Sequence, residues 1–364
     1  MTLFRSKIEF DSLSKKLCLL ILAISLIGVM ILYSADQTHS YAKKHLFHIS
    51  ISMLICVFIV FLNPRVIYNF SYLPYILAII LLIAIEIFGI TAKGGNRWIS
   101  ILGIRFQPSE LTKVGFVLAL AKYLSNVNQD KAFSLKVIFT SCVIAFLPAV
   151  LIIKQPDLGT GMILIFVFVT MLFAFGCSIW LFILGFISVL ISAPIIWSML
   201  HGYQRKRVEI FINPDSDPLG SGYNIIQSKI ALGSGRFLGK GFGMGTQSHL
   251  DFLPEHHTDF IFACFAEEFG FLGCLVMLAL YFSIILINIY IIYFVKNTFH
   301  KMVIVGINSI FFFHIFVNIA MVSGLTPVVG VPLPFISSGG AIFVSMVIGF
   351  SIVLNFYGNK RFYK

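Results

Sequence analysis

Residues 260–294 read FIFACFAEEFGFLGCLVMLALYFSIILINIYIIYF, an apolar run of about 35 residues in which Glu267 and Glu268 are the only charged side chains. A helix needs about 20 residues to cross the hydrocarbon core of a bilayer, so this run is too long for one straight crossing. Gly270 and Gly273 mark a place where a helix can break. The stretch predicts a membrane helix that is either tilted and projecting or interrupted.

Nine further apolar runs occur along the chain, near residues 17–33, 45–62, 68–90, 109–125, 134–153, 160–176, 178–200, 302–323 and 341–357. Hydrophobic residues make up 59% of the 364 residues and charged residues 11%, whereas soluble domains carry about 25% charged residues. This composition excludes a soluble enzyme, a nucleic-acid-binding domain and a disordered chain. It predicts an all-α integral membrane protein with about ten transmembrane helices, which form a single polytopic membrane domain over residues 1–364.

The distribution of basic residues predicts the orientation. If the N-terminus is cytoplasmic, the inner segments carry 13 Lys and Arg residues and the short outer loops carry 6. Because cytoplasmic loops are enriched in Lys and Arg, this imbalance places both termini in the cytoplasm. The 58-residue loop 201–258, between helices 7 and 8, is then outside. The net charge of +11 is explained by this rule and by anionic lipid headgroups rather than by nucleic acid.

This topology gathers the polar motifs on one face. The outer segments contain GGNRW (94–98), QPSE (107–110), QPDLGT (155–160), the loop 201–258 and PLPFISSGG (332–340). A protein that is only anchored in the membrane has no need for five polar stretches on one side. We therefore expect a functional site at the outer face.

Three acidic residues and a lysine are candidates for this site, because ionisable groups are costly near apolar runs. Glu110 and Lys113 have i, i+3 spacing and can pair on one helix face, either as a structural ion pair or facing a polar cavity. Asp157 lies in the QPDLGT motif. Asp259 precedes an apolar run, so it is either a helix N-cap or a carboxylate that acts as general base or metal ligand.

The long outer loop carries basic residues, which the orientation rule does not explain. Guanidinium and ammonium groups bind phosphate well, so a diphosphate ligand would account for them. The alternative is a solvated basic loop on anionic lipid. The candidate ligands are Arg205, Arg207, Lys229 and Lys240. The six cysteines lie in apolar runs without metal-ligand spacing, so the residues themselves indicate no metal site.

Three motifs together resemble the SEDS family (shape, elongation, division and sporulation) of peptidoglycan polymerases: RFQPSE (105–110), QPDLGT (155–160), and LPE (253–255) followed by HTDFIFA (257–263). The stretches DPLGSGY (217–223), IQSKIA (226–231), GTQS (245–248) and PVVGVPLP (327–334) are more similar to its elongation members than to its division members. The resemblance implies ten membrane helices and a catalytic aspartate at the position of Asp259.

The resemblance also implies an activity: an inverting peptidoglycan glycosyltransferase that polymerises lipid II during cell wall elongation and rod-shape maintenance. It implies a divalent cation (Mg or Mn), a class B penicillin-binding protein transpeptidase as partner within the wall-elongation complex, and a location in the bacterial cytoplasmic (inner) membrane with an extracytoplasmic active face. Two other hypotheses remain: a flippase or transporter of the lipid-linked precursor, which would need polar groups reachable from both sides, and a non-catalytic scaffold, which would not need Asp259.

Overall fold

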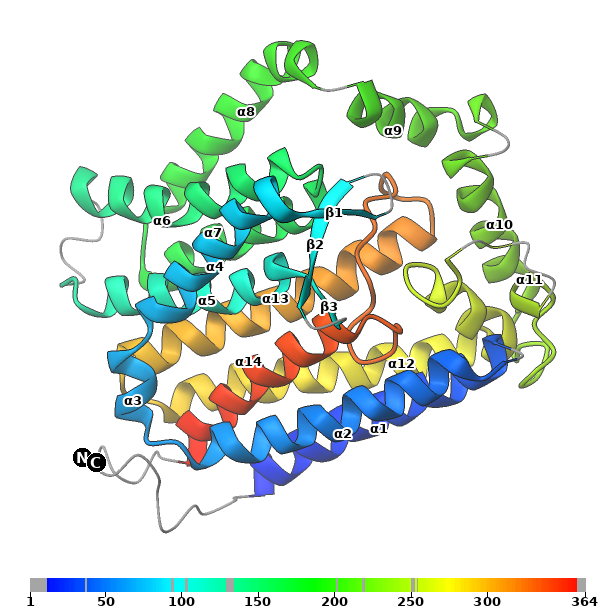
Figure 1. The fold of residues 1–364 in the computed structure, drawn as a ribbon, viewed down its shortest axis with the longest axis horizontal. Helices are drawn as coiled ribbons and strands as arrows, with labels where there is room; N and C mark the ends of the chain where they lie inside the picture. Colours follow the sequence, from blue (N-terminus) through cyan, green and yellow to red (C-terminus); the bar gives the residue numbers. More distant parts are fainter. Residues whose placement is uncertain are drawn as a thin grey trace.

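The computed structural model describes residues 12–36, 38–92, 95–101, 104–128, 134–200, 202–217, 220–249, 253 and 255–358. Long helices in this part of the chain coincide with the ten predicted apolar runs and confirm the all-α membrane fold (Figure 1). These helices are α1 (Ser12–Ala35), α2 (Ser40–Phe61), α4 (Tyr72–Phe88), α5 (Pro108–Ser125), α6 (Leu135–Lys154), α7 (Leu158–Phe175), α8 (Ile179–Met199), α12 (Ile261–Phe294), α13 (Thr298–Val322) and α14 (Gly340–Gly358).

The helices differ in how they meet the membrane. Among the described residues, seven are long and apolar enough to cross it, namely α1, α2, α6, α7, α12, α13 and α14. Tyr72–Phe88 and Ile179–Ile195 are apolar but shorter. Helix α5 carries Glu110, Lys113 and Lys122, yet most of its residues are buried, because α4, α6, α7, α13 and α14 pack around it. The chain is therefore a multi-pass membrane protein with a charged helix at its centre.

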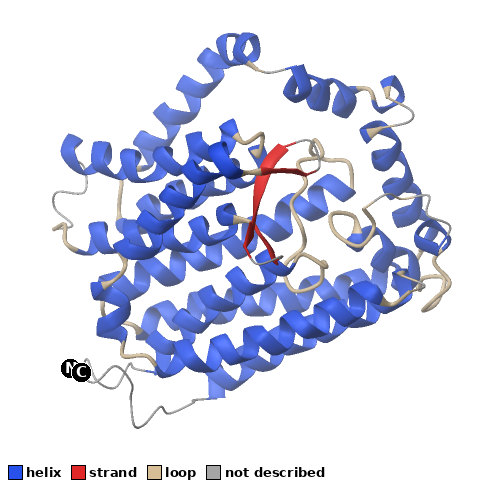
Figure 2. Cartoon of the chain, viewed as in Figure 1, coloured by secondary structure: helices blue, strands red, loops and turns tan. Residues whose placement is uncertain are grey.

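A small antiparallel sheet lies between α4 and α5, in a segment predicted only as an outer loop (Figure 2). Its strands are β1 (Ile90–Ala92), β2 (Gly95–Ile101) and β3 (Ile104–Phe106), in the order β1-β2-β3. Strand β2 pairs Ile99 with Phe106 of β3. Its run of Trp, Ile, Ser and Ile contains the aromatic and β-branched residues that favour strands.

The long run 260–294 is interrupted, which is one of the two alternatives that its length allows. Helix α12 leaves helical geometry at Gly270, where φ is +64° and ψ is −164°. The segment 236–241 fills the break: Lys240 N–H donates to the Glu267 carbonyl at 3.0 Å, and Phe271 N–H donates to the Arg236 carbonyl at 2.9 Å. Because the backbone groups freed by the break find partners in this segment, the broken helix is tolerated at membrane depth.

The loop 201–258 is largely helical in its described part. It contains α9 (Gly202–Ile212), the 3₁₀ helix η2 (Pro214–Ser216), α10 (Ser221–Ser234) and α11 (Thr246–His249), while the short α3 (Pro64–Asn69) joins α2 to α4. Helices α8, α9 and α10 form an arc along one edge of the bundle (Figure 1). Ser228 in α10 donates to the carbonyl of Val322 at 3.0 Å, which attaches the arc to the end of α13.

Candidate functional site at the Asp259 end of the bundle

Asp259 lies in a turn, residues 255–260, immediately before α12. The N-cap position of α12 is occupied by Phe260, so Asp259 is not the N-cap residue that the sequence allowed as an alternative. Its side chain is partly exposed. A Cβ atom built on Gly330, whose φ is +72°, would lie 3.3 Å from Asp259 Oδ2. The carboxylate therefore sits against a stretch of backbone that has no side chain.

Hydrogen bonds join the turn to the predicted 332–340 segment. Ser337 Oγ donates to the Thr258 carbonyl at 2.6 Å, and Ser338 N–H donates to the His257 carbonyl at 3.0 Å. Ser337 Oγ also accepts from Leu333 N–H at 2.8 Å. The two segments are far apart in sequence, but these bonds fix one to the other at the two residues that precede Asp259.

Asn318, in α13, also joins the Asp259 turn to the chain that leads into the 332–340 segment. Its side-chain amide donates to the carbonyl of Asp259 at 2.8 Å and to that of Val331 at 2.8 Å. Both hydrogens of the amide are thereby used. Asn318 is fully buried. One side chain thus sets the position of the backbone that carries Asp259 relative to the backbone at Val331.

An aromatic contact joins the first turn of α2 to the turn that carries Asp259. The Tyr41 ring stacks on the His257 ring, with centroids 3.9 Å apart and planes 17° apart. Asp36 accepts hydrogen bonds from Ser40 N–H at 2.8 Å and from Tyr41 N–H at 3.2 Å, which fixes the first turn of α2. Burial opposes ionisation of Asp36, but hydrogen bonds from its neighbours outweigh it and hold the pKa of this carboxyl well below its ordinary value.

Glu110 and Lys113 form the ion pair that their spacing predicts. Lys113 Nζ lies 2.8 Å from Glu110 Oε2, and the Lys113 side chain is 1% exposed. Lys113 Nζ also lies 2.7 Å from His314 Nε2. An ammonium group only donates, so Nε2 must accept and Nδ1 must carry the proton. Nδ1 then donates to the Pro332 carbonyl, 3.4 Å away. Ser345 Oγ donates to Glu110 Oε2 at 3.1 Å.

This buried network connects to the Asp259 turn through one helix. His314 and Asn318 are four residues apart and lie on the same face of α13. The first donates to Pro332, and the second donates to Val331 and Asp259. Sequence reasoning missed both residues. The signal was present, because a His and an Asn inside an apolar run are expensive in a membrane.

Asp157 lies at the same end of the bundle, directly before α7. Its carboxylate caps α7, accepting from Thr160 N–H at 3.2 Å and from Thr160 Oγ1 at 2.9 Å. Arg97 of β2 donates to the carbonyls of Gln155 and Pro156. A Cβ atom on Gly159 would lie 2.8 Å from Val331 Cγ2. The structure therefore brings the predicted outer stretches into one contiguous region.

The four basic candidates in the loop 201–258 occupy different surroundings. Lys240 Nζ lies 2.5 Å from Glu267 Oε1, and Arg205 caps α8 by donating to the carbonyls of Trp197 and Ser198. Arg207 is partly exposed. Lys229 is exposed and forms no ion pair with a described residue; its chain packs over Gly324. The structure does not gather the four into one cluster, and their role as diphosphate ligands stays a prediction.

Within the described residues, no group of three or more His, Cys, Asp and Glu side chains is arranged to hold a metal ion. A single carboxylate still fits Mg²⁺, which often binds through one or two carboxylates together with substrate phosphates. Asp259 would supply the carboxylate in such a mode.

Comparisons with known proteins agree with these features. Residues 13–361 match the FtsW, RodA and SpoVE family of cell cycle proteins. The peptidoglycan glycosyltransferase MrdB of Escherichia coli K12 is 42% identical over 363 residues, which cover 98% of this chain and 96% of that protein.

Two solved structures share the fold. A chain from a peptidoglycan synthase complex, described as coordinating polymerization and crosslinking, is 25% identical, with a TM-score of 0.84 and coverage of 96% of this chain and 99% of that one. The rod shape determining protein RodA of Thermus thermophilus is 22% identical, with a TM-score of 0.72 and coverage of 94% and 96%. The match across nearly the whole chain confirms what the motifs indicated: the protein belongs to the FtsW/RodA/SpoVE family.

Proposed function

We propose that this protein is a peptidoglycan glycosyltransferase that polymerises lipid II into glycan strands during wall elongation. The observation that carries the proposal is the placement of Asp259, a partly exposed carboxylate in a turn fixed by Asn318 and Ser337. The 42% identity to the glycosyltransferase MrdB supports the same activity. A scaffold has no need for a carboxylate held in this way.

Asp259 acts as the general base in the proposed reaction. It accepts the proton of the 4-hydroxyl on the acceptor's terminal GlcNAc, and that oxygen forms a bond to C1 of the donor's MurNAc. The bond between C1 and the phosphate oxygen breaks, and undecaprenyl diphosphate leaves with the electron pair. Because the diphosphate is a good leaving group, the pair of carboxylates used by glycosidases is not required.

A divalent cation fits the reaction at the diphosphate. Asp259 would help to hold it, and it would neutralise the charge on the leaving group. Gly330 adds no side chain beside this carboxylate, where a Cβ atom would lie 3.3 Å from Asp259 Oδ2.

The proposed location is the bacterial cytoplasmic membrane, with the Asp259 end outside. The 13 to 6 imbalance of basic residues supports this orientation. A cysteine placed at Gln247, in a cysteine-free variant, should react with an impermeant reagent in spheroplasts, whereas one at Lys301 should not. The reverse pattern would contradict an extracytoplasmic active face.

The proposed partner is a class B penicillin-binding protein, which supplies the transpeptidase. Support comes from the similar chain that is part of a peptidoglycan synthase complex. The partner's activity would consume the glycan strands that this chain makes.

The test is a reconstitution. Purified protein with its partner should convert lipid II into long glycan strands when the transpeptidase is inhibited. In sealed vesicles, a flippase would instead move lipid II across the bilayer and make no polymer, and a scaffold would do neither. Absence of polymer from a folded, partner-bound protein would contradict the proposal.

A further inference from the structure

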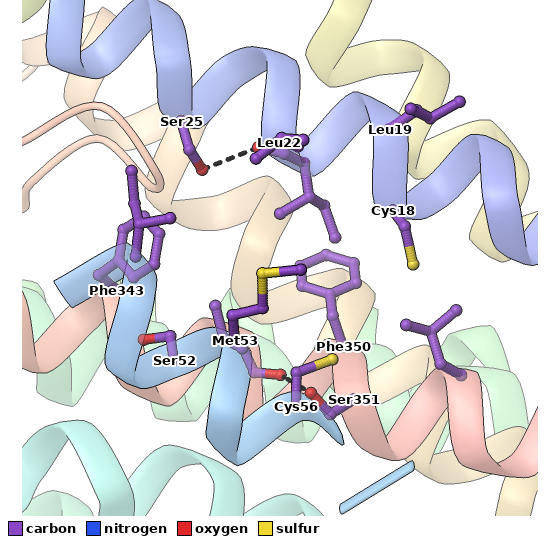
Figure 3. A pocket seen from close by; sticks show the side chains of 14 residues that line it. Cys18, Leu19, Leu22, Ser25, Ser52, Met53, Cys56, Phe343, Phe350 and Ser351 are labelled. Carbon is purple, nitrogen blue, oxygen red and sulfur yellow. Dashed lines mark hydrogen bonds between the residues drawn. The ribbon is translucent and has the colours of Figure 1, made fainter. Parts of the chain in front are cut away.

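An apolar cavity opens between α1, α2 and α14 (Figure 3). Its volume is about 210 Å³. Helix α1 forms one wall, with Leu22 at the rim, and α2 and α14 form the other, with Met53 and Phe350 between them (Figure 3). Leu22 is 42% exposed and Met53 is 64% exposed. Because both face outward, the cavity opens toward the lipid.

Small side chains create the space. Cys18, Ser25, Ser52, Cys56 and Ser351 all line the cavity, where larger residues would close the gap between the helices. Ser25 and Ser351 donate their hydroxyl protons to carbonyls of their own helices. Ser52 is fully buried, and its hydroxyl has no hydrogen-bond partner among the described residues. Neither packing nor hydrogen bonding within the chain therefore completes this wall.

The cavity is elongated along the helices. On α14 it extends from Phe343 to Leu354, which at 1.5 Å per residue is about 16 Å. That length is about half of the roughly 30 Å hydrocarbon core of a bilayer. A hydrocarbon chain lying parallel to the helices matches this shape.

One end of the cavity reaches the loop that frames Asp259. The Phe343 ring meets the Phe335 ring edge-on, with centroids 5.5 Å apart. His45 Nε2 donates to the Phe335 carbonyl at 3.0 Å. Phe335 precedes Ser337 by two residues, and Ser337 bonds to the Thr258 carbonyl beside Asp259. The end of the cavity at Phe343 thus contacts the segment that is bonded to the Asp259 turn, and from there the cavity runs along α14.

We propose that this cavity binds part of the polyprenyl chain of the lipid-linked substrate. The inference rests on the proposed function and identifies where that substrate's hydrocarbon lies. A polyprenyl chain is several times longer than a phospholipid acyl chain. It can leave a headgroup at Asp259 and still extend along the cavity to Cys18, near the opposite end of α1.

Binding of the polyprenyl chain in the cavity is favoured by complementary shape rather than by the hydrophobic effect. Lipid tails are as apolar as the cavity, so moving a chain from bilayer to cavity gains packing contacts and little else. The main consequence is orientation, because a held chain restricts where the headgroup can lie. Filling the cavity should therefore raise the lipid II concentration needed for half-maximal rate more than it lowers the maximal rate.

The first experiment compares two substrates and two kinds of variant. Ser52→Leu and Leu22→Trp fill the cavity from different helices, and Leu77→Trp, on α4 and 50% exposed, is the matched lipid-facing control. With undecaprenyl lipid II, the filled variants should need about 10-fold more substrate, the lower end of the effect of one methylene in an apolar pocket. With a short-chain lipid II, wild type and filled variants should behave alike, because the two changes remove the same contact.

The second experiment does not depend on catalysis. A polyprenyl diphosphate with a photoreactive group near the end of its chain should label α1, α2 or α14 at the cavity, and Ser52→Leu or Leu22→Trp should reduce that labelling. Labelling of the cavity without glycan synthesis would contradict the proposed function but would still support the polyprenyl site. The inference would be overturned if a photoreactive phospholipid labelled the cavity equally and polyprenyl diphosphate failed to displace it. It would also be overturned if the cavity-filled variants kept the wild-type dependence on chain length.

Discussion

Asn318 donates its side-chain amide to the backbone carbonyl of Asp259 at 2.8 Å, and the same nitrogen donates to the carbonyl of Val331. The amide bonds to the peptide of Asp259. It sets where the aspartate stands, and it links the turn before α12 to the segment before α14. Asn318 is therefore a positioning residue in the proposed reaction.

Asn318→Ala should lower kcat with little change in half-saturating lipid II, because the base is displaced while substrate contacts remain. Two buried carbonyls lose their donor, at a cost of about 1–3 kcal/mol each. Steady-state kinetics and thermal unfolding in detergent are the measurements. Wild-type kcat in a folded Asn318→Ala protein would show that Asp259 needs no such support.

The Glu110–Lys113 pair should be required for stability. Removing one partner of a buried ion pair costs about 3–5 kcal/mol, because the other charge is left without compensation. Lys113→Ala and Glu110→Ala should each lower the thermal midpoint and the activity. The swap Glu110→Lys with Lys113→Glu should restore both only in part, since a glutamate would then face His314, which now accepts from Lys113. Two fully stable and active single variants would make the pair irrelevant.

Lys240 should act on stability rather than on substrate binding. Glu267 is fully buried and accepts from Lys240 Nζ, from Thr246 Oγ1 at 2.9 Å and from Gln247 N–H at 3.1 Å. Lys240→Ala should cost about 1.5–3 kcal/mol, the value for a hydrogen bond to a charged group. Its lipid II dependence should match that of Lys206→Ala, an exposed control. If Lys240→Ala raised the half-saturating lipid II concentration without changing stability, Lys240 would instead be a ligand of the diphosphate.

The break in α12 should depend on Gly270. A Cβ atom there would lie 2.3 Å from Gly239 N, and φ is +64°. Gly270→Ala should therefore shift the backbone of segment 236–241 and lower the thermal midpoint. Gly233→Ala, inside α10 with open space around it, is the matched control and should be neutral or slightly stabilising. Equal midpoints for the two variants would mean that the break tolerates a side chain.

The sequence predicts about ten helices and allows a break at Gly270 or Gly273 as one of two alternatives, because long apolar runs and glycines are local signals. The gathering of the polar stretches on one face follows from the predicted topology. The Glu110–Lys113 pair is also predicted from a local signal, as its spacing lies within one helix turn. Long-range partners are not encoded locally: the pairing of Lys240 with Glu267 and the contact of Asn318 with Asp259 appear only when distant helices are packed. The small sheet is not predicted from the sequence, because strands as short as three residues give too little alternation to detect.

Polymerisation by Asp259→Asn tests the central claim most directly. Asparagine keeps the size of the side chain and removes its ability to take a proton, so the variant should fold, insert and bind its partner as wild type does. Loss of a general base lowers rates by about 10²–10⁴-fold, so glycan synthesis from lipid II should fall to about 1% or less. Near-normal synthesis of glycan strands by Asp259→Asn would contradict the account.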